Sequence, residues 1–506
     1  MCGICGLWGR TAVEPVRRMM DRMTHRGPDA EGIYEGDTGV LGHRRLSIMD
    51  PAGGNQPILS SDGRRVIVAN GEIYNFPVLR EALAPAHRFR TRSDTESALH
   101  LYEDVAEEAA ERLDGMYAFA IADGPDLFVA RDPVGIKPLY VGRRDGGLAF
   151  ASELKALAGV ADEVEEFPPG TYFHSRLGRR RFGALAQRAP EPLTVADHAA
   201  RLREGLERAV VKRLMSDVPV GAFLSGGLDS SIIAALARRH VEHLHTFSVG
   251  VEGSRDIEAA RRVSRYLGTE HHEYVFTAAE VLEHLPEILF YLESFDQDLV
   301  RSAIPCYFTA RLAAEHVKVI LTGEGADELF AGYRYYAGVA EPDALHQELH
   351  RSVAALHNVN LQRVDRLTMA HSIEGRVPFL DVEMIDLAQR IPSDLKLRRD
   401  GGRTVEKWIL RKAFEDLLPH DIVWRRKEQF DEGTGTVDVL AAGLERFMRR
   451  EDAPNYASAH AEADLRSPEE AVFHRLLTEA YEDPAPVLQN VARWADRPDH
   501  GRQRDG

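Results

Sequence analysis

Cysteine is scarce in this 506-residue sequence, which contains only Cys2, Cys5 and Cys306. Three cysteines are too few to hold a chain of this length together with disulfides, and their spacing lacks the close pairs of a zinc site. These counts exclude a disulfide-rich secreted fold and a zinc module. We therefore expect a protein of the reducing cytoplasm.

Long apolar runs and excess basic charge are also missing. The longest apolar stretches, such as residues 116–122, are strand-sized and fall short of the roughly 18–20 residues that cross a bilayer. The first residues lack the basic and apolar segments of a secretory signal, so we do not expect export. The 80 acidic residues outnumber the 63 basic ones and give a net charge of −17, which opposes binding to nucleic acid or to an anionic membrane. We expect small-molecule substrates as partners, with no nucleic acid and no membrane.

The pattern of the chain changes near residue 186. In residues 1–185, short β-rich runs at 66–69, 117–122 and 127–130 alternate with turns rich in Gly, Asp and Pro, which predicts stacked sheets. The prolines of QRAPEPLTV cannot continue a helix or a central strand, so residues 186–196 are predicted to be a linker.

The second part has a different rhythm. From residue 197 to about 450, helical stretches such as 254–267 alternate with compact apolar segments, 218–224 and 317–321, which predicts a parallel α/β sheet. Residues 451–506 are more polar and weakly periodic, so we expect an extension whose end is disordered.

Cys2 is the first candidate catalytic residue. Removal of Met1 would leave a thiol and a free α-amine on one residue, and an amine with a pKa near 8 can take the thiol proton. Polar clusters follow: RRLSI, with Arg45 and Ile48; NGEIYN, which begins at Asn70; and SDTE, with Asp94. Taken singly, Asn-Gly is a turn dipeptide and Asp94 an ordinary helix cap.

In this order behind Cys2, the clusters resemble the N-terminal-nucleophile, class II glutamine amidotransferases, whose fold is an αββα sandwich. The resemblance covers about residues 2–180 and implies that glutamine yields ammonia through a thioester. It implies that Arg45 pairs with the glutamine α-carboxylate and that Glu72 and Asp94 receive its α-ammonium. The Asn70 amide and the Gly71 N–H would form the oxyanion hole. The implied glutamine site contains Arg45, Ile48, Asn70, Glu72 and Asp94.

A phosphate-binding loop is predicted at SGGLDSS, residues 225–231. It follows a buried strand and opens a helix, so its glycines and the helix N-terminus would offer N–H groups to an anion. It lacks the GK[ST] ending of a Walker A loop. It resembles instead the pyrophosphate loop (PP-loop) of enzymes that cleave ATP between the α and β phosphates. The expected ATP site comprises Phe223, Leu224, Ser225, Gly226, Gly227, Asp229, Ser230, Val249, Thr322 and Gly323.

Two more segments complete this chemistry. In LTGEGADE, Asp327 would hold Mg²⁺ together with Asp229, and Glu324 would orient the amine or receive its proton. In WRRKEQF, Lys427 would stabilise charge at the α-phosphate. With EGRVPFLD at 374–381, the chain to about residue 435 resembles the glutamine-hydrolysing asparagine synthetases. The resemblance implies ATP and Mg²⁺ as cofactors, an internal ammonia passage, an acyl-adenylate and a homodimer.

Two segments depart from the family pattern, residues 298–301 and residues 431–435, where DEGTG replaces an expected SDGVG. Where a Thr-Thr-x-Arg sequence is expected at the acceptor carboxylate, this chain has Asp298, Leu299, Val300 and Arg301. We assign Asp298, Arg301 and Glu324 to the acceptor site. Aspartate is the first expectation for the acceptor, and another carboxylic acid, giving a different amide or a hydroxamate, is the alternative. An enzyme of the β-lactam synthetase type would lack Cys2, and a catalytically silent binding protein would have no reason to keep these charges.

Overall fold

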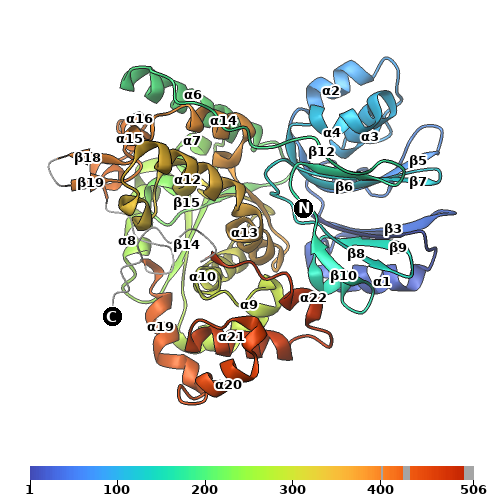
Figure 1. The fold of residues 1–506 in the computed structure, drawn as a ribbon. Helices are drawn as coiled ribbons and strands as arrows, with labels where there is room; N and C mark the ends of the chain where they lie inside the picture. The colour runs from blue at the N-terminus through green and yellow to red at the C-terminus, as the bar shows by residue number, and fades with distance from the viewer. Residues whose placement is uncertain (401–402, 426–432, 495–506) are drawn as a thin grey trace.

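This computed structural model describes residues 1–400, 403–425 and 433–494 (Figure 1). Among these residues, no helix combines the length and the apolar character that crossing a membrane requires.

The N-terminal half is a sandwich of antiparallel sheets with helices outside (Figure 1). One sheet has the order β10-β8-β9-β1-β3-β2, and the other has the order β12-β11-β7-β6-β5-β4. The strands of the first are β10 (Asp162–Glu166), β8 (Tyr140–Arg144), β9 (Gly147–Ala151), β1 (Cys2–Trp8), β3 (Gly39–Arg45) and β2 (Ala30–Glu35). Those of the second are β12 (Gly178–Arg181), β11 (Thr171–His174), β7 (Asp126–Arg131), β6 (Gly115–Asp123), β5 (Arg65–Ile73) and β4 (Ile58–Leu59).

Side-chain alternation along the strands explains the layers. On β5, Val66 and Val68 pack between the sheets, while Ile67 points to the opposite face and packs beneath α3 (Thr95–Val105). On β1, Cys5 packs under α1 (Val13–Asp21). Because alternate residues of a strand face opposite sides, each sheet is buried on both faces. The predicted αββα sandwich is confirmed.

The C-terminal half contains a parallel sheet of order β15-β14-β13-β16-β17. Its strands are β15 (Glu270–Val275), β14 (His245–Gly250), β13 (Val220–Phe223), β16 (Val319–Leu321) and β17 (Glu374–Arg376). The predicted parallel α/β sheet is confirmed. The carboxyl ends of these strands share one edge, which is where ligands bind in such sheets.

Helices surround this sheet (Figure 1). They include α6 (Val195–Lys212), α7 (Leu228–Arg238), α8 (Arg255–Leu267), α9 (Ala278–Leu292), α10 (Gln297–Ala313), α11 (Ala326–Phe330), α12 (Pro342–Ala354), α13 (Asn360–Met369), α14 (Val382–Gln389) and α16 (Trp408–Ala413). A small hairpin, β18 (Arg398–Asp400) and β19 (Arg403–Val405), lies just before α16. After β12 the chain carries no helix or strand until α6, over residues that the structure describes throughout.

Residues 451–494 are folded onto the C-terminal half. They form α20 (Ala453–Ala459), α21 (Pro468–Glu479) and α22 (Ala485–Leu488). Helix α21 packs on α9, and α22 reaches α5 (Leu154–Leu157) and β10 of the N-terminal half. The expected disorder of the chain end falls on residues 495–506, which lie outside the described residues.

A buried network of charges joins the halves. Arg26 donates to both carboxylate oxygens of Asp365 at 2.7 and 3.1 Å and to Glu153 at 2.8 Å. Arg366 pairs with Glu293 at 2.8 Å, and Lys155 lies between Glu153, at 2.6 Å, and Glu293, at 3.1 Å. The described network therefore pairs its cations with an equal number of carboxylates, which is how charges without water are tolerated.

Candidate active sites

Cys2 lies at the start of β1, opposite Arg45 at the end of β3. Its backbone N–H donates to Asn70 Oδ1 at 2.9 Å. This orients the amide so that Asn70 Nδ2, buried, has no hydrogen-bond acceptor among the described residues. An unused buried donor beside a thiol is what an oxyanion would require.

Gly71 occupies a backbone conformation that suits only glycine. Its φ is +142°, and a Cβ there would lie 1.9 Å from the Met116 carbonyl oxygen. The residue that follows Asn70 must therefore be glycine, which lets β5 approach β6 closely beside Cys2.

The predicted carboxylates lie side by side in the same region. Asp94 Oδ2 accepts a hydrogen bond from the Ile73 N–H at 2.6 Å, and Arg376 approaches Glu72 at 3.5 Å. Burial raises the pKa of Asp94 to about 6. Burial also raises the pKa of Glu72, and the negative charges of Glu374 and Asp94 add to this. Two carboxyl groups held away from water are prepared to receive a cation.

The terminal nitrogens of Arg45 are already hydrogen-bonded within the chain. They donate to the carbonyls of Met49, Asp50 and Pro51 and to Asn55 Oδ1, at 2.7–3.1 Å. Ile48 is buried just before this loop. A bidentate pair between Arg45 and a substrate carboxylate would have to replace two of these bonds.

Met1 lies between the two halves. Its amine pairs with Glu374 Oε2 of β17 at 2.9 Å, and Lys137 Nζ contacts its sulfur. The Met1 ammonium and Arg376 hold the pKa of Glu374 at about 2 against the opposing effect of burial. Burial raises the pKa of the Cys2 thiol, which the chain amine and Arg45 partly offset.

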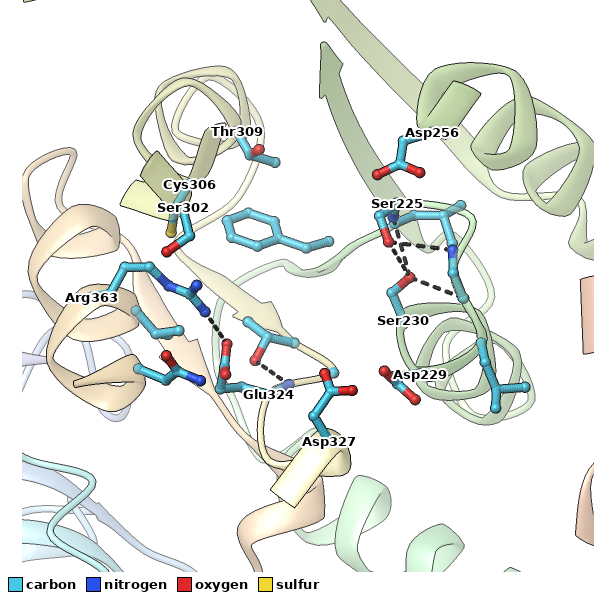
Figure 2. A pocket seen from close by; sticks show the side chains of 18 of the residues that line it. Ser225, Asp229, Ser230, Asp256, Ser302, Cys306, Thr309, Glu324, Asp327 and Arg363 are labelled. Atoms are coloured by element: carbon cyan, nitrogen blue, oxygen red, sulfur yellow. Dashed lines mark hydrogen bonds and ion pairs between the residues drawn. The ribbon is translucent and has the colours of Figure 1, made fainter. Parts of the chain in front are cut away.

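A cavity of about 330 Å³ opens at the carboxyl edge of the parallel sheet (Figure 2). It brings together the predicted ATP residues except Gly226, whose place in the loop is structural. The residues of the prediction that line it are Phe223, Leu224, Ser225, Gly227, Asp229, Ser230, Val249, Thr322 and Gly323.

The phosphate loop joins β13 to α7, as predicted. Gly226 has a φ of +70°, and a Cβ there would lie 2.5 Å from the backbone of Ala259 and Ala260. The Gly227 N–H donates to Ser225 Oγ at 3.3 Å, and the Ser225 N–H donates to Ser230 Oγ at 3.2 Å (Figure 2). The loop is thus closed on its own serines, with the N-terminus of α7 at its end.

Lys407 is a functional candidate that the sequence analysis missed. Its Nζ lies 2.5 Å from Asp229 and 2.6 Å from Asp327, and its side chain is 1% exposed. Its φ of +54° is a strained value for a residue other than glycine. No local motif marks Lys407, because only the fold brings the start of α16 to the ends of β13 and β16.

The pair of aspartates fits a divalent cation. Asp229 Oδ1 is buried and accepts no hydrogen bond from the described residues, and Asp327 faces it across Lys407. Two hard carboxylate groups beside a phosphate loop are the donor set that Mg²⁺ prefers.

Glu324 and Arg363 form an ion pair at the end of the cavity that lies across from Ser225 and Ser230 (Figure 2). Asp298, Ser302 and Cys306, from one face of α10, line this end with them. Arg301, also predicted for the acceptor site, is not among the described residues that line the cavity, and its Nε donates to Glu469 at 2.9 Å. The guanidinium on this wall belongs to Arg363 of α13. Lys427 lies outside the described residues.

Histidines gather away from this cavity. His245, His272 and His316 bring their ring nitrogens within 4.8 Å of one another. The rings of His272 and His316 stack 3.8 Å apart at 25°, and His245 hydrogen-bonds to His272 at 3.1 Å. Because lone pairs lie in the ring planes, stacked rings do not aim at one ion, and we assign no metal here.

Comparison with known proteins agrees with this geometry. A family model described as glutamine amidotransferase domain matches residues 1–178, and one described as asparagine synthase matches residues 201–340 and 337–502.

Similar proteins cover most of the chain. Glutamine-hydrolyzing asparagine synthetase 2 of Arabidopsis thaliana is 41% identical over 460 residues, covering 86% of this chain and 79% of that protein. The glutamine-hydrolyzing asparagine synthetase of Asparagus officinalis is 39% identical over 521 residues, covering 98% and 87%. A probable glutamine-hydrolyzing asparagine synthetase of Dictyostelium discoideum is 37% identical over 542 residues, covering 98% and 96%. The chain belongs to the glutamine-hydrolysing asparagine synthetase family.

Proposed function

We propose that this chain makes asparagine: glutamine releases ammonia at Cys2, and the ammonia amidates an aspartate that ATP has activated in the cavity. The observation that carries the proposal is the presence in one chain of two sites. One has a buried thiol beside carboxylates and an unused amide donor, and the other is a cavity lined by the loop at 225–230, two aspartates and the Glu324–Arg363 pair. Aspartate is favoured over another carboxylic acid because the relatives named above are asparagine synthetases. A silent binding protein would not need the unused donor of Asn70 or the two aspartates that meet at Lys407.

The first reaction uses Cys2 as nucleophile. After Met1 is removed, the α-amine of Cys2 takes the thiol proton, and the thiolate attacks the amide carbon of glutamine. Asn70 Nδ2 and the Gly71 N–H donate to the oxygen that becomes negative, while Asp94 and Glu72 hold the α-ammonium. Ammonia leaves, and water hydrolyses the thioester to glutamate and free Cys2.

Glutamine recognition also needs a group for the α-carboxylate. Arg45 is the proposed partner and Ile48 the apolar wall beside it. Binding would then exchange Arg45's bonds to the 49–55 loop for bonds to substrate, so the loop and the substrate compete for one guanidinium.

The second reaction joins ATP to the acceptor. The aspartate β-carboxylate attacks the α-phosphorus, pyrophosphate leaves toward residues 225–230, and ammonia then attacks the acyl carbon and releases AMP. Arg363 would hold a carboxylate of the acceptor, and Glu324 would take the proton that ammonia loses. Lys407 would supply positive charge beside the phosphates, and the same role is proposed for Lys427 from the sequence.

Mg²⁺ is the proposed second cofactor, held by Asp229 and Asp327. When bound, it would neutralise charge on the pyrophosphate. Lys407 lies between these carboxylates and would turn toward the phosphates as the cation takes its place.

Met1 supports a closed route for ammonia. Its side chain packs with Leu46, Ile48, Tyr74 and Met116, and its amine reaches β17 of the other half. Its removal would leave a buried space leading from Cys2 toward Glu374. Confinement matters because ammonia is protonated in water and loses its nucleophilicity.

A homodimer and a cytoplasmic location are further proposals. The family resemblance supports the first, and the three free, buried cysteines support the second. Sedimentation velocity and cell fractionation test them.

One assay tests the central proposal. Purified protein is mixed with glutamine, ATP, Mg²⁺ and aspartate, and pyrophosphate and the amide product are quantified, the latter by mass spectrometry. We expect one asparagine per pyrophosphate. Cys2→Ala should abolish synthesis from glutamine and retain synthesis from ammonium, with Cys5→Ala as the matched control. Loss of both activities in a folded Cys2→Ala protein would overturn the two-site mechanism. Pyrophosphate release that does not depend on aspartate would indicate that the acceptor is another carboxylic acid.

A further inference from the structure

The last described segment of the chain, residues 490–494, follows α22 and ends at the cavity of the parallel sheet. In Figure 1 this dark-red segment passes close to α10 and α13. Trp494 lines the cavity together with Asp298, Tyr333 and Asn360. Residues near the C-terminal end of the described chain thus contribute to the wall of the synthetase site.

Buried contacts fasten this segment. The Trp494 N–H donates to Asp296 Oδ2 at 3.1 Å, and Arg466 pairs with the same oxygen at 2.6 Å. Asp296 is fully buried, and its other oxygen caps α10 by accepting from the Leu299 N–H at 3.0 Å. One carboxylate therefore fixes both the start of α10 and the backbone of Trp494.

Its neighbours hold the segment on both sides. Arg493 lies over the Phe295 ring at 4.3 Å and pairs with Glu470 at 2.9 Å. Asn490 donates to the Val164 carbonyl of β10 at 2.9 Å. These contacts hold the segment in one position, whereas the last residues of a domain are poorly ordered unless such contacts tie them down.

The indole meets the aromatic and polar groups at the acceptor end. Its ring contacts Tyr333 edge to face, with centroids 5.2 Å apart and planes at 85°. The Tyr333 hydroxyl accepts from Asn360 Nδ2 at 3.0 Å and donates to Glu328 at 2.7 Å. Asn360 lies one helical turn before Arg363, which pairs with Glu324.

We infer that Trp494 is the outer wall of the acceptor site, where it limits the size of the carboxylic acid that enters and keeps water from the acyl-adenylate. The inference rests on the proposed placement of the acceptor beside Glu324 and Arg363. A large, flat and mostly apolar side chain suits both tasks, since the faces of its ring offer no hydrogen bond to water and it fills a fixed volume. Water that reaches the adenylate attacks the acyl carbon, releases AMP and returns the free carboxylate, so ATP is consumed without amide.

The test compares Trp494→Ala, Trp494→Phe and the control Tyr266→Ala, whose side chain is 56% exposed on α8. Each protein is assayed for pyrophosphate released per asparagine formed, for KM of aspartate, ATP and glutamine, and for use of glutamate as a longer acceptor. For Trp494→Ala we expect a rise of about tenfold in KM for aspartate, corresponding to about 1.4 kcal/mol. We also expect more than one pyrophosphate per asparagine and a gain in glutamate use. KM for ATP and glutamine should stay within about twofold, and Trp494→Phe should recover most of the coupling.

Each outcome bears on one proposal. A wild-type protein that releases no aspartate-dependent pyrophosphate defeats the proposed function. The inference about Trp494 alone is overturned by a different result. In that case the wild type forms one asparagine per pyrophosphate, and a folded Trp494→Ala protein keeps the same ratio of pyrophosphate to asparagine, the same KM for aspartate and the same range of acceptors. If Trp494→Ala does not fold by circular dichroism, Trp494→Leu replaces it, and an unchanged ratio and acceptor range in that variant overturn the inference as well.

Discussion

The buried ion pair between Arg26 and Asp365 gives a sharp prediction about how the halves hold together. Arg26 is fully buried and Asp365 is 3% exposed, and two hydrogen bonds of 2.7 and 3.1 Å join them. Replacement of Asp365 by Asn keeps the volume and removes the charge, which leaves Arg26 with Glu153 as its remaining carboxylate among these contacts. Breaking a buried pair from one side costs about 3–5 kcal/mol, and because Asn still accepts one bond we expect about 3 kcal/mol.

Urea unfolding measures this cost. With an m value of about 3 kcal/mol per M, the midpoint of Asp365→Asn should fall by about 1 M. Tryptophan fluorescence and residual glutaminase activity should be followed together, because a two-domain chain need not unfold in one step. The double variant Arg26→Met, Asp365→Leu removes both charges and leaves the rest of the network balanced, so its midpoint should fall by less than half as much. A single variant that unfolds within about 0.2 M of the wild type would refute this account of the interface.

Three further predictions concern the two sites. Because burial raises the pKa of Asp94 to about 6, kcat/KM for glutamine should fall about tenfold per pH unit below that value; a profile flat to pH 5 contradicts the role of Asp94 as the ammonium partner. Gly71→Ala places a Cβ 1.9 Å from a carbonyl oxygen and should lower glutaminase activity about 100-fold or more while ammonium-dependent synthesis persists; near-normal glutaminase would disprove the strain argument. Lys407→Met should lower aspartate-dependent exchange of pyrophosphate into ATP by about 100-fold with glutaminase unchanged. Its control is Lys412→Met in α16, whose side chain is 34% exposed and pairs with Glu415, and this variant should have no effect; equal exchange in the two variants would remove Lys407 from the site.

Local signals account for what could be predicted from the sequence. The phosphate loop follows from a strand, two glycines and a helix start within about ten residues, and the structure places β13, Ser225–Gly227 and α7 in that order. The sheets of the first half follow from short apolar runs, such as 66–69, that are bounded by turn residues. These elements are determined by neighbours in the chain.

A sequence motif does not tell which way a side chain points from its helix or which distant helices meet, and the remaining residues of the cavity depend on both. On α10, Asp298 and Ser302 are four residues apart and face the cavity together, while Arg301 lies about 100° around the helix from Ser302 and meets α21 instead. Lys407 and Arg363 reach the cavity from helices far along the chain, so neither carries a local signal. Trp494 was hidden for the same reason, since a polar stretch with weak periodicity gives no hint of what it packs against.

The chemistry of the two halves is coupled through β17. Glu374 of this strand pairs with the Met1 amine and with Arg376, and Arg376 also faces Glu72 of the glutamine site at 3.5 Å. The pKa of Glu72 and that of Asp94 both rise in part because Glu374 is negative. Removal of Met1 moves the chain's α-amine from beside Glu374 to Cys2, one residue farther along β1, so less positive charge remains next to Glu374 until another cation arrives. The α-ammonium of glutamine is such a cation, and its binding restores the balance of charge at the boundary with the synthetase half.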